Sequence, residues 1–566
     1  MTTRRAGTWG LTAVVAIALL LFLAWPLAEA VRGAFVDPNG HWTGAYVLAA
    51  FRDPVYLSGL RNALIIAVLS ALLADVVGIG LALLLDRYDV PGRRWLAPLI
   101  PLPLLLPPFV GAMGIRQLLG QSGAVNTLLE HLGLLSGAHP IDWLRQGRLA
   151  AVVGLTALHL CPIVFFSVQS ALASVNVELE EAAASLGCHG VRRFWKITLP
   201  LILPSVFGGT SIALIWGLTE LGVPLVCDFT QVTSVQIFSG LKDIGHNPFV
   251  YALVAVVLLV SVTLYGGARA VIGRAPPAVV NKASRRRQLG RLRGARAALA
   301  CAALVTAVGA AALPNLAVVL LALSRDWYGT VLPTGFTLDH FRAAVSHEMV
   351  IPAIGNSLRY VCLSVAADLL LGTAIAWIVV RAPSALARAI DAAAMLPLAV
   401  PGLVMAFGYL AISREGRPFA FWNPVRDPTP FLVIAYAMRR LPLVVRSAAA
   451  GLSQVSTTLE EAAAGLGAGP LRTFRRITLP LVAPHLFAGA VFAFALSLLE
   501  VSDSLILAQR QSTYPITKAI YELFQLLGDG RQVAAALGMW AMLFLLFSFL
   551  FVRSVLGRRI GNLFRL

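Results

Sequence analysis

Runs of about twenty predominantly apolar residues recur along the whole of this 566-residue chain. A helix rises about 1.5 Å per residue, so a run of that length crosses a hydrocarbon core of about 30 Å. Barrel strands are excluded, because their hydropathy alternates over about ten residues. We therefore predict an all-α integral membrane protein with about twelve transmembrane helices. The predicted spans are 9–30, 60–85, 96–119, 149–173, 205–227, 249–272, 297–323, 356–380, 391–412, 430–450, 486–508 and 533–556.

The composition excludes a soluble globular protein. Apolar residues make up 58% of the chain and charged residues only 13%, whereas a soluble domain carries about 25% charged residues. The net charge of +18 would suggest nucleic acid in a soluble protein. In a membrane protein it is typical of basic residues gathered in cytoplasmic loops. We therefore predict contact with a lipid membrane and not with nucleic acid.

The residues that carry chemistry elsewhere are absent or scattered here. None of the four lysines follows a glycine, as the phosphate-binding lysine of a P-loop does. The five cysteines lack C-x-x-C spacing, and the nine histidines form no H-E-x-x-H pattern. We therefore predict no catalytic residues, no metal, no cofactor bound by this chain and no ATP hydrolysis by it.

Clusters of arginine and lysine predict the orientation in the membrane. They occupy residues 87–94, 192–196, 274–296, 472–476 and 553–565, which all fall on one side when the amino terminus is inside. We predict a bacterial inner-membrane protein with both termini in the cytoplasm. The first span ends in Ala-Glu-Ala like a signal peptide, but its apolar run is longer than usual, which favours an uncleaved helix.

The chain contains an internal repeat. The sequence EEAAA at residues 180–184 recurs at residues 460–464, and ITLPL at 197–201 recurs at 477–481. Both pairs are separated by 280 residues, because 460 − 180 and 477 − 197 give the same difference. Six predicted spans per repeat is an even number, so both repeats enter the membrane from the same side. Parallel repeats of this kind are typical of transporters.

The repeat divides the chain into two units. The first repeat is predicted over residues 1–273 and the second over 297–566, joined by an arginine-rich cytoplasmic linker over 274–296. Further upstream, Asn62 matches Asn356 at a separation of 294 residues. The second repeat therefore has about fourteen fewer residues in an external loop.

A two-helix motif follows the fourth span of each repeat. Each copy reads Glu-Ala-Ala, three residues, glycine, nine residues, Ile-x-Leu-Pro. The Glu-Ala-rich stretch is a strong helix former, and glycine ends that helix in a left-handed cap. A proline, which restricts the backbone, then precedes the next span. We call the two copies the first EAA loop (174–204) and the second EAA loop (451–484). We expect them to dock on a cytoplasmic partner, and the alternative is an interfacial helix that lies on lipid headgroups.

At these residues the chain resembles the permeases of binding-protein-dependent ABC importers, and its fused repeats resemble the ferric-iron members. The resemblance implies that each EAA loop docks on one of two copies of a cytoplasmic ATPase subunit, which uses the ATP. It also implies an extracytoplasmic substrate-binding protein. The ATPase-coupling residues would be Glu180, Glu181, Ala182, Ala183, Gly187 and Pro200, with Glu460, Glu461, Ala462, Ala463, Gly467 and Pro480.

Several charged residues lie inside predicted spans, where an unpaired carboxylate costs several kcal/mol. Glu220 and Glu500 are equivalent, and Asp75 and Asp368 are nearly so. They are candidates for an acid-lined pathway, with interhelical hydrogen bonding as the structural alternative.

Other polar groups in the predicted spans have simpler interpretations. His159 is expected to be an interhelical donor, and the adjacent arginines 439 and 440 are expected to snorkel toward the cytoplasmic end.

Prolines are concentrated at the starts of the third and ninth spans, at residues 98–108 and 397–401. They predict broken helices, which often line transport sites.

The combined prediction is an ABC importer permease for a small solute, with ferric iron as the first choice. Thiamine, phosphonate and polyamine remain alternative substrates. An ion-coupled secondary transporter and a membrane-embedded enzyme are the alternatives of a different class.

Overall fold

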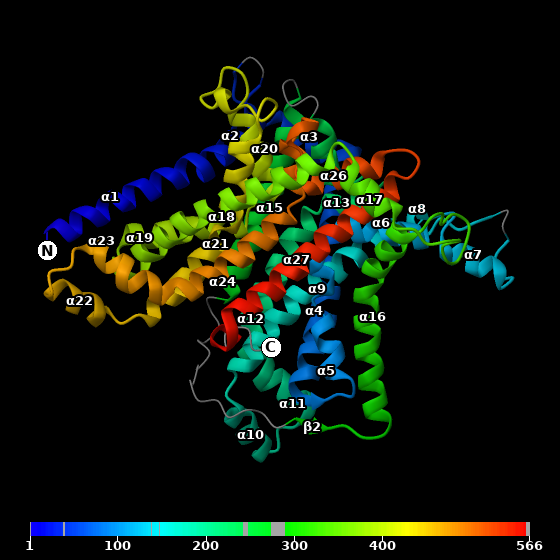
Figure 1. The fold of residues 1–566 in the computed structure, drawn as a ribbon, viewed down its shortest axis with the longest axis horizontal. Helices are drawn as coiled ribbons and strands as arrows, with labels where there is room; N and C mark the ends of the chain where they lie inside the picture. Colours follow the sequence, from blue (N-terminus) through cyan, green and yellow to red (C-terminus); the bar gives the residue numbers. More distant parts are fainter. Residues whose placement is uncertain are drawn as a thin grey trace.

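The computed structural model describes residues 2–37, 40–136, 139–146, 148–241, 247–272 and 289–561, and this part of the chain is almost entirely helical (Figure 1). Up to residue 272 its elements are α1 (Thr2–Leu19), η1 (Leu20–Ala24), α2 (Trp25–Phe35), α3 (Ala45–Arg52), α4 (Pro54–Arg87), β1 (Tyr88–Asp89), α5 (Arg93–Leu96), η2 (Ala97–Leu99), η3 (Leu102–Leu105), α6 (Pro108–Leu119), α7 (Ala124–His131), α8 (Trp143–Gln146), α9 (Arg148–Ser174), α10 (Val177–Ser185), α11 (Gly190–Arg193), η4 (Phe194–Thr198), α12 (Leu199–Leu218), α13 (Gly222–Val226), α14 (Thr233–Gly240) and α15 (Pro248–Ile272).

From residue 289 onward a second series of helices follows the same order. Its elements are β2 (Gly290–Arg291), α16 (Ala295–Leu323), α17 (Asp339–Ser346), α18 (Val350–Arg381), α19 (Ala385–Met395), η6 (Leu396–Leu398), α20 (Gly402–Ile412), η7 (Ala420–Trp422), α21 (Thr429–Gln454), α22 (Thr457–Gly465), α23 (Pro470–Thr473), η8 (Phe474–Thr478), α24 (Leu479–Leu498), α25 (Ser502–Leu507), η9 (Gln511–Thr513), α26 (Ile516–Gln525) and α27 (Gly530–Gly561).

The prediction of an all-α membrane protein is confirmed. Within the described residues, nine helices are long and apolar enough to cross a membrane, and there are up to eleven if each bent helix pair is one span. The remaining predicted span, 430–450, falls in α21, a helix of 26 residues. It carries Arg439, Arg440 and Arg446, which makes it less apolar than the others. Arg439 and Arg440 form the ion pairs described below, and Arg446 pairs with Asp391 at 3.0 Å.

The predicted breaks at the proline clusters are confirmed. The segments Arg93–Leu105 and Pro108–His131 meet at an angle of 101°, and Ala385–Leu398 meets Gly402–Ile412 at 106°. Proline lacks the N–H that continues a helix and restricts the residue before it. Each repeat therefore has one sharply broken helix at the matching place.

The linker predicted over 274–296 lies largely outside the described residues, which resume at 289. Where the chain resumes, β2 pairs in parallel with β1, so that Tyr88 faces Gly290 and Asp89 faces Arg291. The end of the linker is therefore held beside the end of α4, close to the first EAA loop in Figure 1.

The first membrane helix of each repeat packs against the broken helix of the other repeat. The helix α2 contacts α20, and α16 contacts α6. Both crossings depend on a glycine. A Cβ on Gly114 would lie 2.8 Å from the backbone nitrogen of Val318, and a Cβ on Gly408 would lie 2.7 Å from the backbone oxygen of Pro26. The first membrane helix of each repeat therefore takes part in the contact between the two repeats.

We expect Gly114→Val and Gly408→Val to destabilise the protein, because backbone atoms at these crossings cannot give way as a flexible side chain would. Overpacking of this kind costs about 1–3 kcal/mol. The measurement is the yield of monodisperse protein and its thermal unfolding midpoint in detergent. Gly309→Val on α16 is the control, since a Cβ there meets nothing within 4 Å. Equal midpoints for all three variants would contradict the close crossings.

Candidate translocation pathway and EAA loops

Each EAA loop is a short helix, a glycine turn and a second helix that leads into the following span. The helices α10 and α22 are capped at their amino ends by Asn176 and Ser456, whose side chains accept from the backbone. Gly187 has φ 82° and Gly467 has φ 80°, the left-handed region that favours glycine. The predicted glycine turns are therefore present in both copies.

The first glutamate of each motif is buried in the protein. Glu180 is 3% exposed and accepts hydrogen bonds from Arg87 at 3.3 Å and from the Thr198 hydroxyl at 2.5 Å. The arginine also donates to the threonine hydroxyl at 2.8 Å. This network ties the end of α4 to α10 and to the start of α12.

The second repeat builds the same network. Glu460 is 5% exposed and accepts from Arg381 and from the Thr478 hydroxyl, both at 3.2 Å. Sequence reasoning missed the two arginines and the two threonines. They recur at the repeat separations of 294 and 280 residues, because 381 − 87 and 478 − 198 give those values. That recurrence is the signal that could have identified them.

The rest of each motif divides between surface and interior. Glu181, Ala182 and Pro200 are exposed, whereas Ala183 is buried. In the second repeat the same positions behave alike: Glu461, Ala462 and Pro480 are exposed and Ala463 is buried.

Both loops also expose large apolar side chains at matching positions. Leu186 is 88% exposed in the first loop, and Leu466 is 90% exposed in the second. Two further pairs accompany them, with Val191 at 73% and Leu471 at 69%, and with Leu179 at 45% and Leu459 at 47%. We call these six residues the apolar loop surfaces. Exposed apolar patches outside lipid mark interaction sites.

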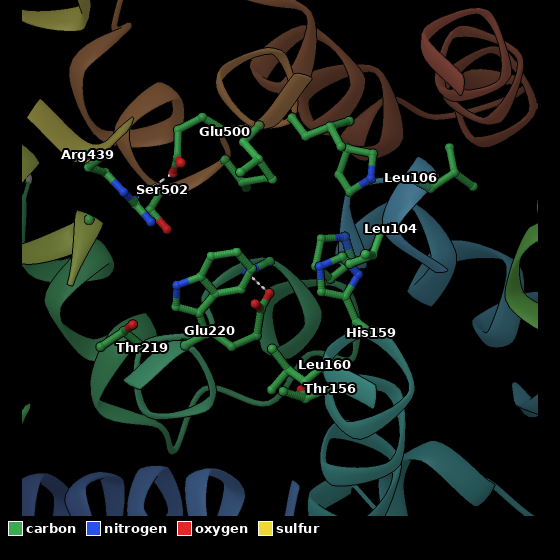
Figure 2. A pocket seen from close by; sticks show the side chains of 18 of the residues that line it. Leu104, Leu106, Thr156, His159, Leu160, Thr219, Glu220, Arg439, Glu500 and Ser502 are labelled. Carbon is green, nitrogen blue, oxygen red and sulfur yellow. Dashed lines mark hydrogen bonds and ion pairs between the residues drawn. The ribbon is translucent and has the colours of Figure 1, made fainter. Parts of the chain in front are cut away.

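A cavity of about 110 Å³ lies where the two repeats meet (Figure 2). Its wall combines the broken helices and the segments that follow α12 and α24. The lining residues are Leu104, Leu106, Pro107, Pro108, Thr156, His159, Leu160, Trp216, Thr219, Glu220, Gly222, Gly402, Arg439, Arg440, Leu496, Leu499, Glu500, Val501 and Ser502. The proline breaks and the glutamates predicted for a pathway therefore come together.

The second repeat places a buried ion cluster in this wall. Glu500 is 6% exposed and pairs with Arg439 at 2.8 Å and Arg440 at 2.6 Å. The predicted snorkelling of these arginines is wrong, because their guanidinium groups turn inward to the carboxylate of Glu500. We call these three residues, with Asp503 at 3.5 Å from Arg439, the ion cluster.

The first repeat lacks this cluster. At the separation of 280 residues, His159 matches Arg439 and Leu160 matches Arg440. The carboxylate of Glu220 instead accepts from the backbone N–H groups of Gly222 and Val223, both at 3.1 Å. The equivalent glutamates thus have different partners, and the cavity is lined by both signs of charge.

The two aspartates do not line the cavity. Asp75 accepts from the Thr210 hydroxyl at 2.8 Å and is partly exposed. Asp368 is 1% exposed and lies in the interior of α18. Asp75 thus has an interhelical hydrogen bond, whereas neither carboxylate oxygen of Asp368 has a hydrogen-bond partner among the described residues.

Comparison with known proteins identifies the family. The model of the binding-protein-dependent transport system inner membrane component matches residues 76–275 and 368–562. A probable ABC transporter permease protein, y4fN of Sinorhizobium fredii, is 27% identical over 489 residues, covering 85% of this chain and 84% of the relative. The ferric transport system permease protein FbpB of Actinobacillus pleuropneumoniae is 25% identical over 511 residues, covering 87% and 70%.

A shorter relative matches about one repeat. The molybdenum transport system permease protein ModB of Mycobacterium tuberculosis is 30% identical over 264 residues, which cover 46% of this chain and 93% of that protein. A multi-pass helical bundle built from two parallel repeats is typical of membrane transport proteins. The family match covers both repeats, and this chain belongs to the binding-protein-dependent ABC permeases of the inner membrane. ATP hydrolysis in such a system takes place on a partner subunit.

Proposed function

We propose that this permease moves a small solute from an external binding protein through the cavity, driven by two copies of an ATPase docked on its two EAA loops. The near-equal exposure of the apolar loop surfaces supports two identical docking partners, since Leu186 and Leu466 differ by two percentage points. In this proposal the EAA loops and both termini lie in the cytoplasm. Figure 1 shows the amino end of α1 and the loop helix α22 at the same edge of the molecule.

The residues of each EAA loop have distinct roles in this proposal. The exposed Glu181 and Glu461 contact the ATPase beside the apolar loop surfaces. The buried Glu180 and Glu460 fix the loop to the membrane helices, so that a push on the loop reaches α4 and α18. Gly187 and Gly467 allow the turn, and Pro200 and Pro480 begin the following span.

We propose ferric iron as the solute. The support is the resemblance of nearly the whole chain to permeases named for ferric transport, which reach 25% identity over 81–87% of this chain. An anionic solute is the second candidate, because two arginines line the cavity. Phosphonate is an anion and belongs to this second class. One relative of this chain, ModB, is named for the transport of molybdenum.

The test is uptake by proteoliposomes that contain the permease, its ATPase and the binding protein from the same gene neighbourhood. We expect ATP-dependent uptake of radioactive iron, and competition by unlabelled ferric iron but not by molybdate or phosphonate. Uptake of an oxyanion without iron uptake would overturn the ferric assignment and favour the second candidate.

A further inference from the structure

The first repeat places a histidine and a carboxylate on the wall of the cavity, and among the described residues neither forms an ion pair with a basic side chain of the second repeat. Figure 2 shows Glu220, His159 and Thr156 in the lower part of the view, and Arg439 and Glu500 above them. All five line the same cavity. The two repeats therefore present different chemistry to whatever passes between them.

The tautomer of His159 is fixed by its contact with the broken helix. Its Nδ1 atom lies 3.0 Å from the backbone oxygen of Pro103. A carbonyl oxygen only accepts, so Nδ1 carries the proton and donates it. In the neutral ring, Nε2 then keeps its lone pair. A backbone carbonyl that holds the far nitrogen of the ring is the usual support of a metal-ligating histidine.

The carboxylate of Glu220 is likewise held in place by backbone groups. One oxygen, Oε1, accepts from both Gly222 and Val223 at 3.1 Å, at the first turn of α13. No ion pair to Glu220 is present among the described residues, which contrasts with the double pairing of Glu500. The hydroxyl of Thr156 lies one turn from His159 on α9. It is 3% exposed and has no hydrogen-bond partner among the described residues.

We propose that Glu220 and the Nε2 atom of His159 form a transient metal-ion site in the pathway, carried by the first repeat alone. The proposal rests on the proposed function, because it takes a ferric ion as the solute. Carboxylate oxygen and imidazole nitrogen are both ligands for iron. The described residues contain no group of three or more ligating side chains that could hold a metal ion. Two protein ligands give weak binding, which a pathway needs if the ion is to leave.

The ion cluster of the second repeat explains why the site is one-sided. At the position equivalent to His159, the guanidinium of Arg439 neutralises Glu500. Because Arg439 and Arg440 both pair with Glu500, its carboxylate is not free to bind a metal ion. The carboxylate that is available to a cation in the cavity is therefore that of Glu220 in the first repeat.

The test uses the whole permease, with Glu220→Gln and His159→Gln as variants. The glutamine at position 159 keeps an N–H donor for the Pro103 oxygen but lacks the imidazole lone pair. Asp75→Asn is the matched control, since it removes a carboxylate of the membrane region that does not line the cavity. Iron uptake and ATP hydrolysis stimulated by the binding protein are measured in proteoliposomes. Binding of Co²⁺ alone to purified permease is followed by its visible absorption.

We expect both cavity variants to lose at least tenfold in iron uptake and to lose the Co²⁺ absorption, while stimulated ATP hydrolysis stays within twofold of wild type. The control is expected to match wild type in all three. Iron uptake at the wild-type rate in both cavity variants would overturn the site and leave the proposed function intact. If the wild-type permease moves another solute and no iron, the ferric assignment fails. The metal site is tested separately, because a wild-type permease that does not bind Co²⁺ would reject it.

Discussion

Replacing Leu186 and Leu466 with glutamate is expected to abolish ATP-driven uptake and to detach the ATPase subunits. These are the most exposed apolar side chains of the two EAA loops, at 88% and 90%. Truncation of an interface hot spot costs about 2 kcal/mol or more, which is about 30-fold in affinity for each loop. A buried charge at the same place costs at least as much. The measurement is co-purification of the ATPase with the permease, followed by uptake in proteoliposomes.

The control for this experiment is Leu527→Glu, because Leu527 is 97% exposed in the turn before α27, away from the EAA loops. It is expected to leave ATPase binding unchanged. Single variants of Leu186 and Leu466 are expected to weaken binding to a similar degree, since the two loops have the same geometry. Full ATPase binding by the double variant would show that the apolar loop surfaces are not the docking sites.

Replacing Glu500 with glutamine is expected to destabilise the permease by about 3–5 kcal/mol, because it leaves two buried arginines with Asp503 as the remaining acidic member of the ion cluster. The measurement is the thermal unfolding midpoint of the purified protein. Glu220→Gln is the comparison for stability, since Glu220 accepts only backbone hydrogen bonds in the described structure. We expect a much smaller shift for that variant.

A rescue experiment separates electrostatics from packing in the ion cluster. The variant Glu500→Gln is combined with three substitutions that place the matching residues of the first repeat in the second. These are Arg439→His, Arg440→Leu and Asp503→Val. The fourfold variant leaves no unpaired arginine in the interior, and an unpaired buried charge is what makes the loss of one partner costly. We therefore expect the fourfold variant to recover most of the lost midpoint. A fourfold variant less stable than Glu500→Gln alone would mean that the cluster is needed for packing and not only for charge balance.

The membrane spans, the repeat and the glycine turns could be predicted because they depend on local composition and on matching within the sequence. The EAA loops carry their own signals, a helix-forming stretch followed by glycine and proline. The broken helices at residues 107 and 401 likewise follow from proline chemistry. Each of these features is decided by residues close together in the chain.

The polar networks could not be predicted, because they join helices whose packing the sequence does not reveal. Arg87 pairs with Glu180 across 93 residues, although the arginine is also typical of a cytoplasmic loop. Arg440 pairs with Glu500 across 60 residues, and a snorkelling side chain satisfies the same local pattern. The packing of each first helix against the broken helix of the other repeat depends on close approach at Gly114 and Gly408, which have no distinctive neighbours in sequence.

The most direct test of the central claim, that transport is driven by an ATPase docked on the two EAA loops, is uptake by proteoliposomes with and without that subunit. Uptake is measured with ATP inside, with a non-hydrolysable analogue inside, and with a proton or sodium gradient in place of ATP. The account predicts uptake only when the ATPase, the binding protein and hydrolysable ATP are all present. Uptake driven by an ion gradient through the permease alone would contradict it and identify a secondary transporter.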